Sequence, residues 1–393
     1  IGSLEDEWRN LEVLSIDNEW GSSSFGKPVF VPIVGFRKNG PAPILNICLR
    51  DGRTIRCTVN HVLPKLLPKN TRKNRKAIAK KPLSIEYVAA EDLRIDDNLF
   101  MLEQTPLSPR PPETLFIPDV IPEESIHVGI RREDYTKFSY RRSQRTENPL
   151  ISLINEEFRY SKASRWYRAR WNDLTAEAKN MIREHESGAP PFYLKLIESS
   201  GRWREAGKWE NIRIKLDEDF FAFMGWYLSE GHVGVNRVSI SQYQEVNPTY
   251  FKQIGTLLQR MELPFAIYSE KDHVIHSKIL AAVMESLCGN RSRNKSIPIH
   301  LLDKERAGIV LDSFFKGDGN INTRGARRYS TSSKQLAYDI LYLLAALGKH
   351  ASVHREQSMF RIVESKGLKY QRTGRVLIDF NGTHAVRIRS IQK

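Results

Sequence analysis

Hydrophobic and polar residues follow different patterns along the 393 residues of this chain. Residues 1–105 contain short β-branched runs broken by turn residues, such as PILNICLRDGRTIRCTV, in which Asp51-Gly52 predicts a hairpin. Residues 216–355 instead place apolar residues three and four positions apart, which predicts helices in FMGWYLSE, PTYFKQIGTLLQRM and SKQLAYDILYLLAALG. Residues 356–393 return to short strands. The pattern therefore predicts an α+β multidomain chain whose first and last parts are β-rich.

An internal repeat divides the helical region into two halves. FMGWYLSEG at 223–231 and LDSFFKGDG at 311–319 are both short apolar helices that close on an acid followed by glycine. Each is followed by a strand, a helix and another strand. Such repetition predicts two similar halves related by a pseudo-two-fold axis within one monomer.

Small residues lie four positions apart in each motif: Gly225 and Ser229 in the first, Ser313 and Gly317 in the second. Positions four apart share a helical face, and small side chains there let two helices approach closely. If the helices cross on these faces, Glu230 and Asp318 project side by side.

Two neighbouring carboxylates repel each other, and a divalent cation relieves that repulsion. We expect Glu230, Asp318 and Gly317 to supply oxygen ligands, because Mg²⁺ prefers carboxylate and carbonyl oxygens together with substrate phosphates. Mn²⁺ accepts the same ligands. A metal held there can activate water for attack on a phosphodiester. The alternative reading of a single KGDG is an ordinary turn.

The charge balance points to a polyanionic partner. The formal net charge is +15, which favours nucleic acid, although a basic surface that binds nothing is the alternative. Three cysteines without a CxxC pair argue against a zinc ribbon or a disulfide framework, and they fit an intracellular, cytoplasmic location. No run of eighteen apolar residues occurs, so no membrane span is expected.

The paired motifs resemble those of LAGLIDADG homing endonucleases, which implies two αββαββα-like halves. The resemblance implies that Glu230 and Asp318 bind Mg²⁺ at a catalytic centre that cuts double-stranded DNA at a long asymmetric site. NKSIPIHLL, residues 294–302, resembles the Lys-x-Ile-Pro segment of intein-borne members, which implies that Lys295 is the lysine near the active site. A second lysine is usual in that family, and either Lys366 or Lys369 could supply it.

Residues 1–105 and 356–393 resemble the two parts of the intein splicing domain, or Hint fold. DGRTIRCTVNHVLPKL resembles its Thr-x-x-His segment, which implies that Thr58 and His61 are the remnant of a splicing site. The sequence starts at Ile1 rather than at Cys or Ser, and no His-Asn pair ends it. We therefore expect no splicing from the sequence as it stands.

Residues 106–215 form a basic insert in which Arg and Lys alternate with Tyr and Trp. We expect this insert to bind DNA beyond the central site; the alternative is a solvated helical insert with a small aromatic core. The strands RVSISQYQ and RRYSTSS are expected in the DNA major groove, since Arg pairs with guanine and Gln with adenine. The expected DNA-contacting residues are Arg237, Gln242, Gln244, Arg327 and Arg328 on these strands, and Arg141, Arg142, Arg165, Arg168 and Arg170 in the insert.

The favoured function is an intein-encoded, site-specific DNA endonuclease. Two alternatives remain open at this stage. One is a DNA-binding protein or RNA maturase that uses the same scaffold without cleavage. The other is a splicing protein whose endonuclease is inactive.

Overall fold

The computed structural model describes residues 12–16, 28–35, 40–66, 85–102, 105–121, 126–142, 149–162, 164–185, 191–196, 210–323, 325–356, 359–364 and 383–392. They fall into two compact units. One comprises residues 1–109, 302–311 and 318–393, and the other comprises residues 110–301 and 312–317. Lys366 and Lys369 lie outside the described residues.

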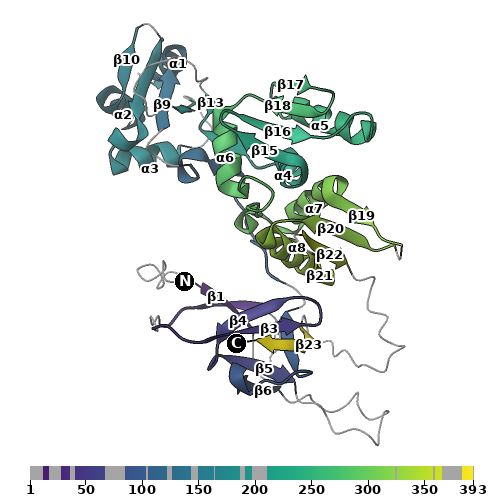
Figure 1. Ribbon diagram of the computed structural model, residues 1–393. Coiled ribbons are helices and arrows are strands. Elements are labelled where there is room, and N and C mark those ends of the chain that lie inside the picture. The colour runs from purple at the N-terminus through teal and green to yellow at the C-terminus, as the bar shows by residue number, and fades with distance from the viewer. Residues whose placement is uncertain are drawn as a thin grey trace, which may run out of the picture. The chain divides into compact units, whose positions relative to one another are not determined.

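A six-stranded antiparallel sheet joins the two ends of the chain. In spatial order its strands are β4 (Thr54–Thr58), β3 (Ile44–Leu49), β23 (Thr383–Gln392), β7 (Asn98–Leu102), β5 (Val62–Leu66) and β6 (Ile85–Ala89). The last strand of the chain therefore lies between two strands from its first hundred residues (Figure 1). A 3₁₀ turn, Ala90–Asp92, follows β6, and β1 (Glu12–Ile16) pairs separately with β2 (Pro28–Pro32). Strands from both ends of the chain thus share one sheet.

Alternation along β3 explains how this sheet is stabilised. Leu45, Ile47 and Leu49 are buried, and they pack in one cluster with Cys57 and Leu99. Because strand side chains alternate between faces, these three residues define the covered face of the sheet. The predicted hairpin is confirmed, since β3 pairs antiparallel with β4 around Asp51-Gly52 and Gly52 has a positive φ of 89°.

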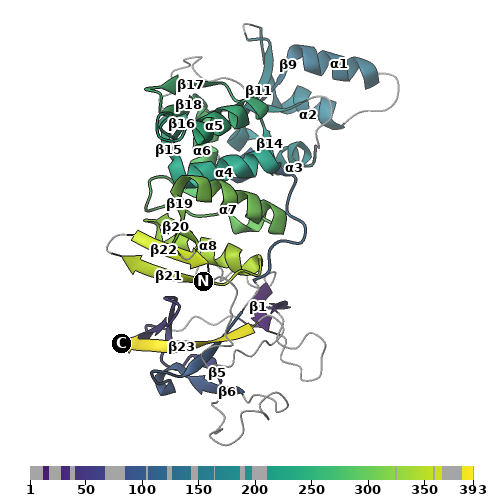
Figure 2. The same ribbon diagram turned by 90° about the vertical axis from the view of Figure 1, so that its right-hand side faces the viewer.

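The basic insert folds around its own five-stranded antiparallel sheet. In spatial order the strands are β10 (Arg159–Ser161), β11 (Trp166–Arg170), β9 (Ile126–Arg131), β12 (Tyr193–Leu196) and β13 (Glu210–Asn211). The helices are α1 (Arg132–Arg142), α2 (Pro149–Glu157) and α3 (Ala176–Glu184), with 3₁₀ turns at Ile117–Asp119 and Trp171–Asp173. Strands β8 (Thr114–Phe116) and β14 (Arg213–Lys215) pair with each other. Figure 2 shows α1 and α2 beside β9 and β11, so the insert is a mixed domain rather than a helical one.

The predicted internal repeat is confirmed. The first half consists of α4 (Glu218–Glu230), β15 (Gly231–Gly234), β16 (Arg237–Ser241), α5 (Pro248–Arg260), β17 (Phe265–Tyr268), β18 (Asp272–Ile275) and α6 (Lys278–Cys288). After a 3₁₀ turn at Ile299–Leu301, the second half consists of α7 (Lys304–Asp318), β19 (Gly319–Ile321), β20 (Arg327–Thr331), α8 (Lys334–Ala346), β21 (Ala351–Glu356) and β22 (Met359–Glu364). In both sheets the spatial order is first, second, fourth and third strand. Each half has two more strands than were read directly from the repeat, and the first half has the αββαββα order that the resemblance implied.

The second half extends beyond the expected limit at residue 355. Strand β22 lies between β20 and β21 in the same sheet, with Tyr329 opposite Ile362 and Val353 opposite Ile362. Residues 359–364 therefore belong to the second half and not to the terminal β-rich part. The short, charged strand β22 carried no sequence signal that separated it from the tail.

In the part of the chain that the structure describes, none of the helices combines the length and the apolar character that crossing a membrane requires.

Candidate functional site

The two acid–glycine motifs begin and end in the same way. Asp217 caps α4 by accepting a hydrogen bond from the Phe220 amide at 3.1 Å, and Asp303 caps α7 by accepting one from the Arg306 amide at 2.9 Å. Such caps satisfy amides that have no partner inside the helix. Each helix thus has a fixed start, and each ends on its acid, at Glu230 and at Asp318.

Both helices pass directly into a strand at the glycine after the acid. Gly231 and Gly319 have extended backbones, with φ of −88° and −108° and ψ of 154° and 157°. At the first corner the turn is tight, since a Cβ added to Gly231 would lie 2.6 Å from the Tyr227 carbonyl oxygen. The glycine is required there by the close approach of the backbone.

Gly317 meets the end of α4 at very close range. A Cβ added to Gly317 would lie 2.6 Å from the Ser229 Cβ and 3.0 Å from the Glu230 Cγ, and it would also overlap the Ser229 hydroxyl oxygen. Ser229 turns this hydroxyl back to the Trp226 carbonyl at 3.2 Å. The expected close approach of small residues is confirmed at this pair. Asp318 is the next residue after Gly317. The contact therefore restrains the backbone directly before Asp318.

Lys295 contacts the first corner, where α4 passes into β15 at Gly231. Its side chain is only 4% exposed, and its ammonium donates hydrogen bonds to the carbonyl oxygens of Tyr227 at 2.8 Å, Leu228 at 3.0 Å and Gly231 at 2.8 Å. The ammonium also lies 5.2 Å from the centre of the Tyr227 ring. An ammonium has three N–H donors, and here backbone carbonyls take three hydrogen bonds from it.

Lys271, which the sequence analysis did not single out, lies at the strand ends near Glu230. Gly231 pairs with Ile240, so the end of β16 lies next to the corner, and there the Ser241 hydroxyl donates to Asp272 at 2.5 Å. Lys271 precedes Asp272, and its ammonium lies 4.5 Å from the centre of the Tyr243 ring. A hydrogen bond with Tyr243 raises the pKa of Lys271 above its usual value, and the charges of Tyr243, Asp272 and Glu230 add to this shift. Only the folded register brings this lysine close to the acid.

The residues expected on the first DNA-facing strand differ in exposure. Arg237 is exposed, on the face of β16 opposite the buried Val238 and Ile240. Gln244 is also exposed. Gln242 is only 7% exposed, and its side-chain oxygen accepts a hydrogen bond from Asn247 at 3.3 Å. The structure therefore uses Gln242 to brace the loop after β16.

The two arginines on the second strand point to opposite faces. Arg327 shares a face of β20 with Tyr329 and Thr331, both of which are buried, whereas Arg328 shares the other face with Ser330. Arg328 therefore lies on the face of β20 opposite the buried Tyr329.

One face of the insert sheet gathers cations. Register pairs Arg168 with both Arg159 and Gly129, and it pairs Trp166 with Arg131, so these side chains share a face. The opposite face carries Val128, Ile130 and Leu194, which are buried. We call the first face the basic sheet face; it comprises His127, Arg131, Arg159, Trp166, Arg168, Arg170, Tyr193 and Lys195.

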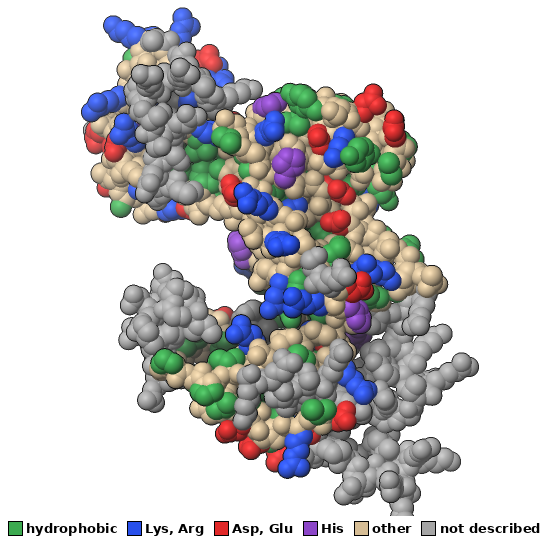
Figure 3. Space-filling view, viewed as in Figure 1, with side chains coloured by type: hydrophobic (Ala, Val, Ile, Leu, Met, Phe, Trp, Pro, Cys, Tyr) green, Lys and Arg blue, Asp and Glu red, His purple; other side chains and the backbone are tan. Residues whose placement is uncertain are grey.

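The positive charge of the basic sheet face affects the pKa of His127. Burial lowers the pKa of His127 to about 4, and the neighbouring charges of Arg170, Arg168 and Lys195 lower it further while Asp173 opposes them. Arg131 lies 4.8 Å from the centre of the Tyr193 ring and 5.6 Å from that of Trp166. Figure 3 shows Lys and Arg side chains standing out over the insert.

The other expected arginines of the insert lie elsewhere. Arg165 occupies the β10–β11 turn with a positive φ of 58°, outside the paired strands. Arg141 and Arg142 end α1, and their side chains lie outside the described part of the structure.

Thr58 and His61 enclose a short turn between β4 and β5. The His61 amide donates to the Thr58 carbonyl at 3.1 Å, and the His61 carbonyl accepts from Ala90 at 2.8 Å. His61 is exposed. The Thr-x-x-His segment thus lies at the junction of β4 and β5.

Glu230 at the first corner and Asp318 at the second are carboxylates, which are donors that a hard divalent cation prefers. Among the described residues, no cluster of three or more His, Cys, Asp and Glu side chains could hold a metal ion. Mg²⁺ needs no such cluster, because it retains several waters and binds through one or two carboxylates together with phosphate oxygens. The close approach of Gly317 to Glu230 leaves room for no side chain at this point.

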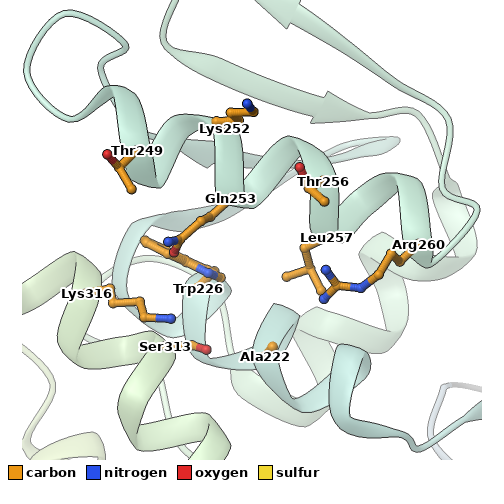
Figure 4. Close-up of a pocket in the computed structure, with 10 residues that line it drawn as sticks. All are labelled: Ala222, Trp226, Thr249, Lys252, Gln253, Thr256, Leu257, Arg260, Ser313 and Lys316. Carbon is orange, nitrogen blue, oxygen red and sulfur yellow. The ribbon is translucent and has the colours of Figure 1, made fainter.

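A pocket of about 460 Å³ lies among helices α4, α5 and α7 (Figure 4). Trp226 of α4, Gln253 and Lys252 of α5, and Ser313 and Lys316 of α7 line it. All its lining residues come from helices, so the pocket is separate from the strands expected to face DNA.

A family model described as a LAGLIDADG-like domain matches residues 308–378. The match contains the second acid–glycine motif and all four strands of the second sheet. The chain therefore carries a LAGLIDADG-like domain in this region.

Relatives of known sequence include proteins with different overall roles. The DNA polymerase of Thermococcus aggregans is 27% identical over 237 residues, 58% of this chain and 12% of that protein. An uncharacterized protein of Methanocaldococcus jannaschii is 32% identical over 183 residues, 40% of this chain and 20% of the relative. The ATP-dependent DNA helicase Hel308 of Thermococcus kodakarensis is 32% identical over 160 residues, 36% of this chain and 14% of the helicase. The chain spans a fifth or less of the length of these relatives.

Solved structures with some similarity are those of the homing endonuclease I-DmoI. One is a mesophilic variant, with a TM-score of 0.30 and 13% identity, covering 38% of this chain and 89% of that chain. Another is I-DmoI in complex with DNA and Mn, with a TM-score of 0.28 and 14% identity, covering 38% of this chain and 90% of that chain.

Proposed function

We propose that this chain is a site-specific homing endonuclease that makes a double-strand break in DNA by metal-dependent phosphodiester hydrolysis. The observation that carries the proposal is the close approach of Gly317 to Ser229 and Glu230. This contact lies at the end of α4, which is Glu230, and one residue before the end of α7, which is Asp318. The LAGLIDADG-like match over residues 308–378 supports the same reading.

In this proposal Glu230 and Asp318 together hold one divalent cation, Mg²⁺ or Mn²⁺, with the Gly317 carbonyl as a further oxygen ligand. Bound there, the cation would activate a water molecule and stabilise charge on the scissile phosphate. The carboxylates orient the cation, and the glycines keep side chains out of the space between the helices. Arg237, Gln244 and Arg328 would contact the target on either side.

The experiment is cleavage of a duplex library, or of the uninterrupted host gene, with Mg²⁺. Glu230→Gln and Asp318→Asn should each abolish cutting while leaving DNA affinity within about threefold. Glu218→Gln is the matched control, because Glu218 is exposed and lies at the opposite end of the same helix. Tight binding without cutting by the unmodified chain would favour the DNA-binding or maturase alternative instead.

We further propose that the chain is an element carried in frame within a host protein. The supporting observation is that a polymerase and a helicase each match it over only 12% and 14% of their own length. An element that inserts into different host genes would give proteins of different function one shared segment. The six-stranded sheet, which unites β3 and β7 with β23, supports a splicing-type domain interrupted by the endonuclease. Introducing the chain with its natural flanks into a reporter, and looking for the joined reporter, tests this directly.

The basic sheet face is the part of the insert that we propose binds DNA. Its cations lie on one side of a sheet, with apolar residues on the other, which is the arrangement of a surface rather than a core. Phosphate contacts there should make affinity strongly dependent on salt, with a slope of about −0.9 per phosphate neutralised. This location replaces the looser expectation that all the insert arginines act together.

The test measures DNA affinity against salt concentration for Arg168→Gln/Arg170→Gln. The magnitude of the slope should fall by about 1.8 if both residues contact phosphate. Lys252→Gln/Lys316→Gln is the control, because it removes two cations from the helical pocket instead. An equal fall in the control would mean that net charge alone, and not this face, governs binding.

A further inference from the structure

The position of Lys295 differs from what a lysine that touches substrate requires. Its ammonium gives hydrogen bonds at 2.8–3.0 Å to three backbone carbonyls, and its side chain is buried. A lysine that offsets charge on a scissile phosphate needs at least one donor directed outward. In this structure the Lys295 ammonium donates instead to backbone carbonyls around the first corner.

The three acceptors have a common feature, because all belong to the junction where α4 becomes β15. The last carbonyls of a helix have no partner within it. Leu228 is among these residues, and Gly231 follows the helix directly. A cation at a helix C-terminus is also favoured by the helix dipole. Lys295 therefore stabilises the corner both by hydrogen bonding and by charge.

The segment that carries Lys295 is itself attached to the same corner. The Tyr227 hydroxyl donates to the Gly289 carbonyl at 2.7 Å, and the Asn290 side chain donates to the Val233 carbonyl at 3.1 Å. Behind it, the Ser296 amide donates to the Cys288 carbonyl at 3.0 Å. The segment between α6 and α7 is thus bonded to the end of α4 and to the strand that follows.

We propose that Lys295 is a positioning residue, which fixes the backbone at the end of α4 so that Glu230 presents its carboxylate to the metal. This inference rests on the proposed function, since it concerns the ligand geometry of that same site. It assigns Lys295 no contact with DNA. The role differs from that implied by the sequence resemblance, in which this lysine acts beside the scissile phosphate.

The first test measures Mn²⁺ binding to the complex of the full chain with its DNA, by the electron paramagnetic resonance signal of free Mn²⁺. Lys295→Met keeps the length of the side chain but removes its charge and its donors. We expect Mn²⁺ affinity to fall by at least tenfold, with metal-free DNA affinity unchanged and part of the cutting rate restored at high Mn²⁺. Lys304→Met is the matched comparison, because Lys304 is an exposed lysine at the start of α7, and it should leave Mn²⁺ affinity within threefold. Unchanged Mn²⁺ affinity in Lys295→Met overturns the proposal, whatever happens to the rate.

A second measurement uses the unmodified chain, so it does not depend on how the variant folds. Reductive methylation with mass spectrometry reports which lysines are accessible. Lys295 should resist methylation equally in the free chain and in the DNA complex, while the partly exposed Lys271 reacts. Methylation of Lys295 in the free chain, with protection by DNA, would overturn the proposal.

The two measurements also separate this inference from the proposed function. If Glu230→Gln leaves Mn²⁺ affinity unchanged, the proposed metal site itself is wrong. If Glu230→Gln lowers that affinity but Lys295→Met does not, the site stands and only the positioning role is wrong.

Discussion

Gly317 and Ser229 approach so closely that a Cβ on Gly317 would lie 2.6 Å from the Cβ of Ser229. No other side chain fits at position 317 without moving α4, because even alanine brings a methyl group into the Ser229 side chain. The same added atom would lie 3.0 Å from the Glu230 Cγ. The spacing of the helices and the position of one proposed ligand therefore depend on the same glycine.

Gly317→Ala should destabilise the fold by about 1–3 kcal/mol, because overpacking forces neighbouring atoms apart. Cutting should be lost to a greater extent than stability, since the shift falls directly on Glu230. Chemical denaturation and cleavage assays at a fixed temperature measure the two effects.

Gly308→Ala is the control for that change. Gly308 lies in the same helix, and a Cβ added there would meet nothing within 4 Å. Alanine should therefore stabilise the helix by about 0.5–1 kcal/mol, since it restricts the unfolded chain. If Gly317→Ala behaved like Gly308→Ala, close packing at the motif would not matter for activity.

A buried histidine in the first half predicts how stability changes with pH. His273 is 1% exposed, its ring centre lies 4.3 Å from that of Phe251, and burial lowers its pKa to about 4, with Asp272 opposing. The folded state thus favours the neutral form of the His273 imidazole. Stability is fully present above the unfolded pKa near 6.5 and falls as pH drops from there towards 4, by up to about 3 kcal/mol.

Hydrogen exchange of β18 at pH 6.5, 5.5 and 4.5 measures this effect locally. His273→Gln should remove the dependence of β18 on pH, whatever it does to overall stability. His127 has a similarly lowered pKa but lies in the insert, so exchange there should still follow pH in the variant. A β18 response that survives in His273→Gln would assign the titration to another group.

The sequence predicted the repeated helices and their acid corners because these depend on local signals. An aspartate cap, an apolar face and a closing glycine all lie within one segment, as at Asp217 and Gly231. The role of Lys295 depends instead on how the chain returns from α6 to the end of α4, which no spacing of residues reveals. The burial of Gln242 is of the same kind, since Asn247 reaches it only in the folded loop.

The insert shows the opposite difficulty. Arg, Tyr and Trp residues are mixed along β11, so the sequence shows little contrast between its covered and open faces. Only the pairing of Arg168 with Gly129 and Arg159 shows which residues share a face. Arg165, which is adjacent in sequence, lies in a turn and does not join them.

Tyr227 offers a test of the junction without altering charge. Its hydroxyl is the donor to the Gly289 carbonyl, and the side chain is fully buried. Tyr227→Phe should cost about 1–3 kcal/mol, because it leaves that carbonyl without this donor. Exchange of amides in residues 289–296 should rise at the same time. Tyr268→Phe, at a side chain that is 49% exposed, should change neither quantity.

The last strand of the chain should be required for the first hundred residues to fold. β23 pairs with β7 from Thr383 to Arg387 and with β3 from Ile388 to Gln392, so its removal opens the centre of the six-stranded sheet. Each hydrogen bond lost contributes about 1 kcal/mol, and the apolar face beneath would also become exposed. Deleting residues 383–392 should therefore abolish exchange protection of the β3 and β7 amides that face β23. Protection in β16 and β18, which belong to a different sheet, should be retained. Unchanged protection of β3 and β7 would show that the first hundred residues form a stable sheet without the end of the chain.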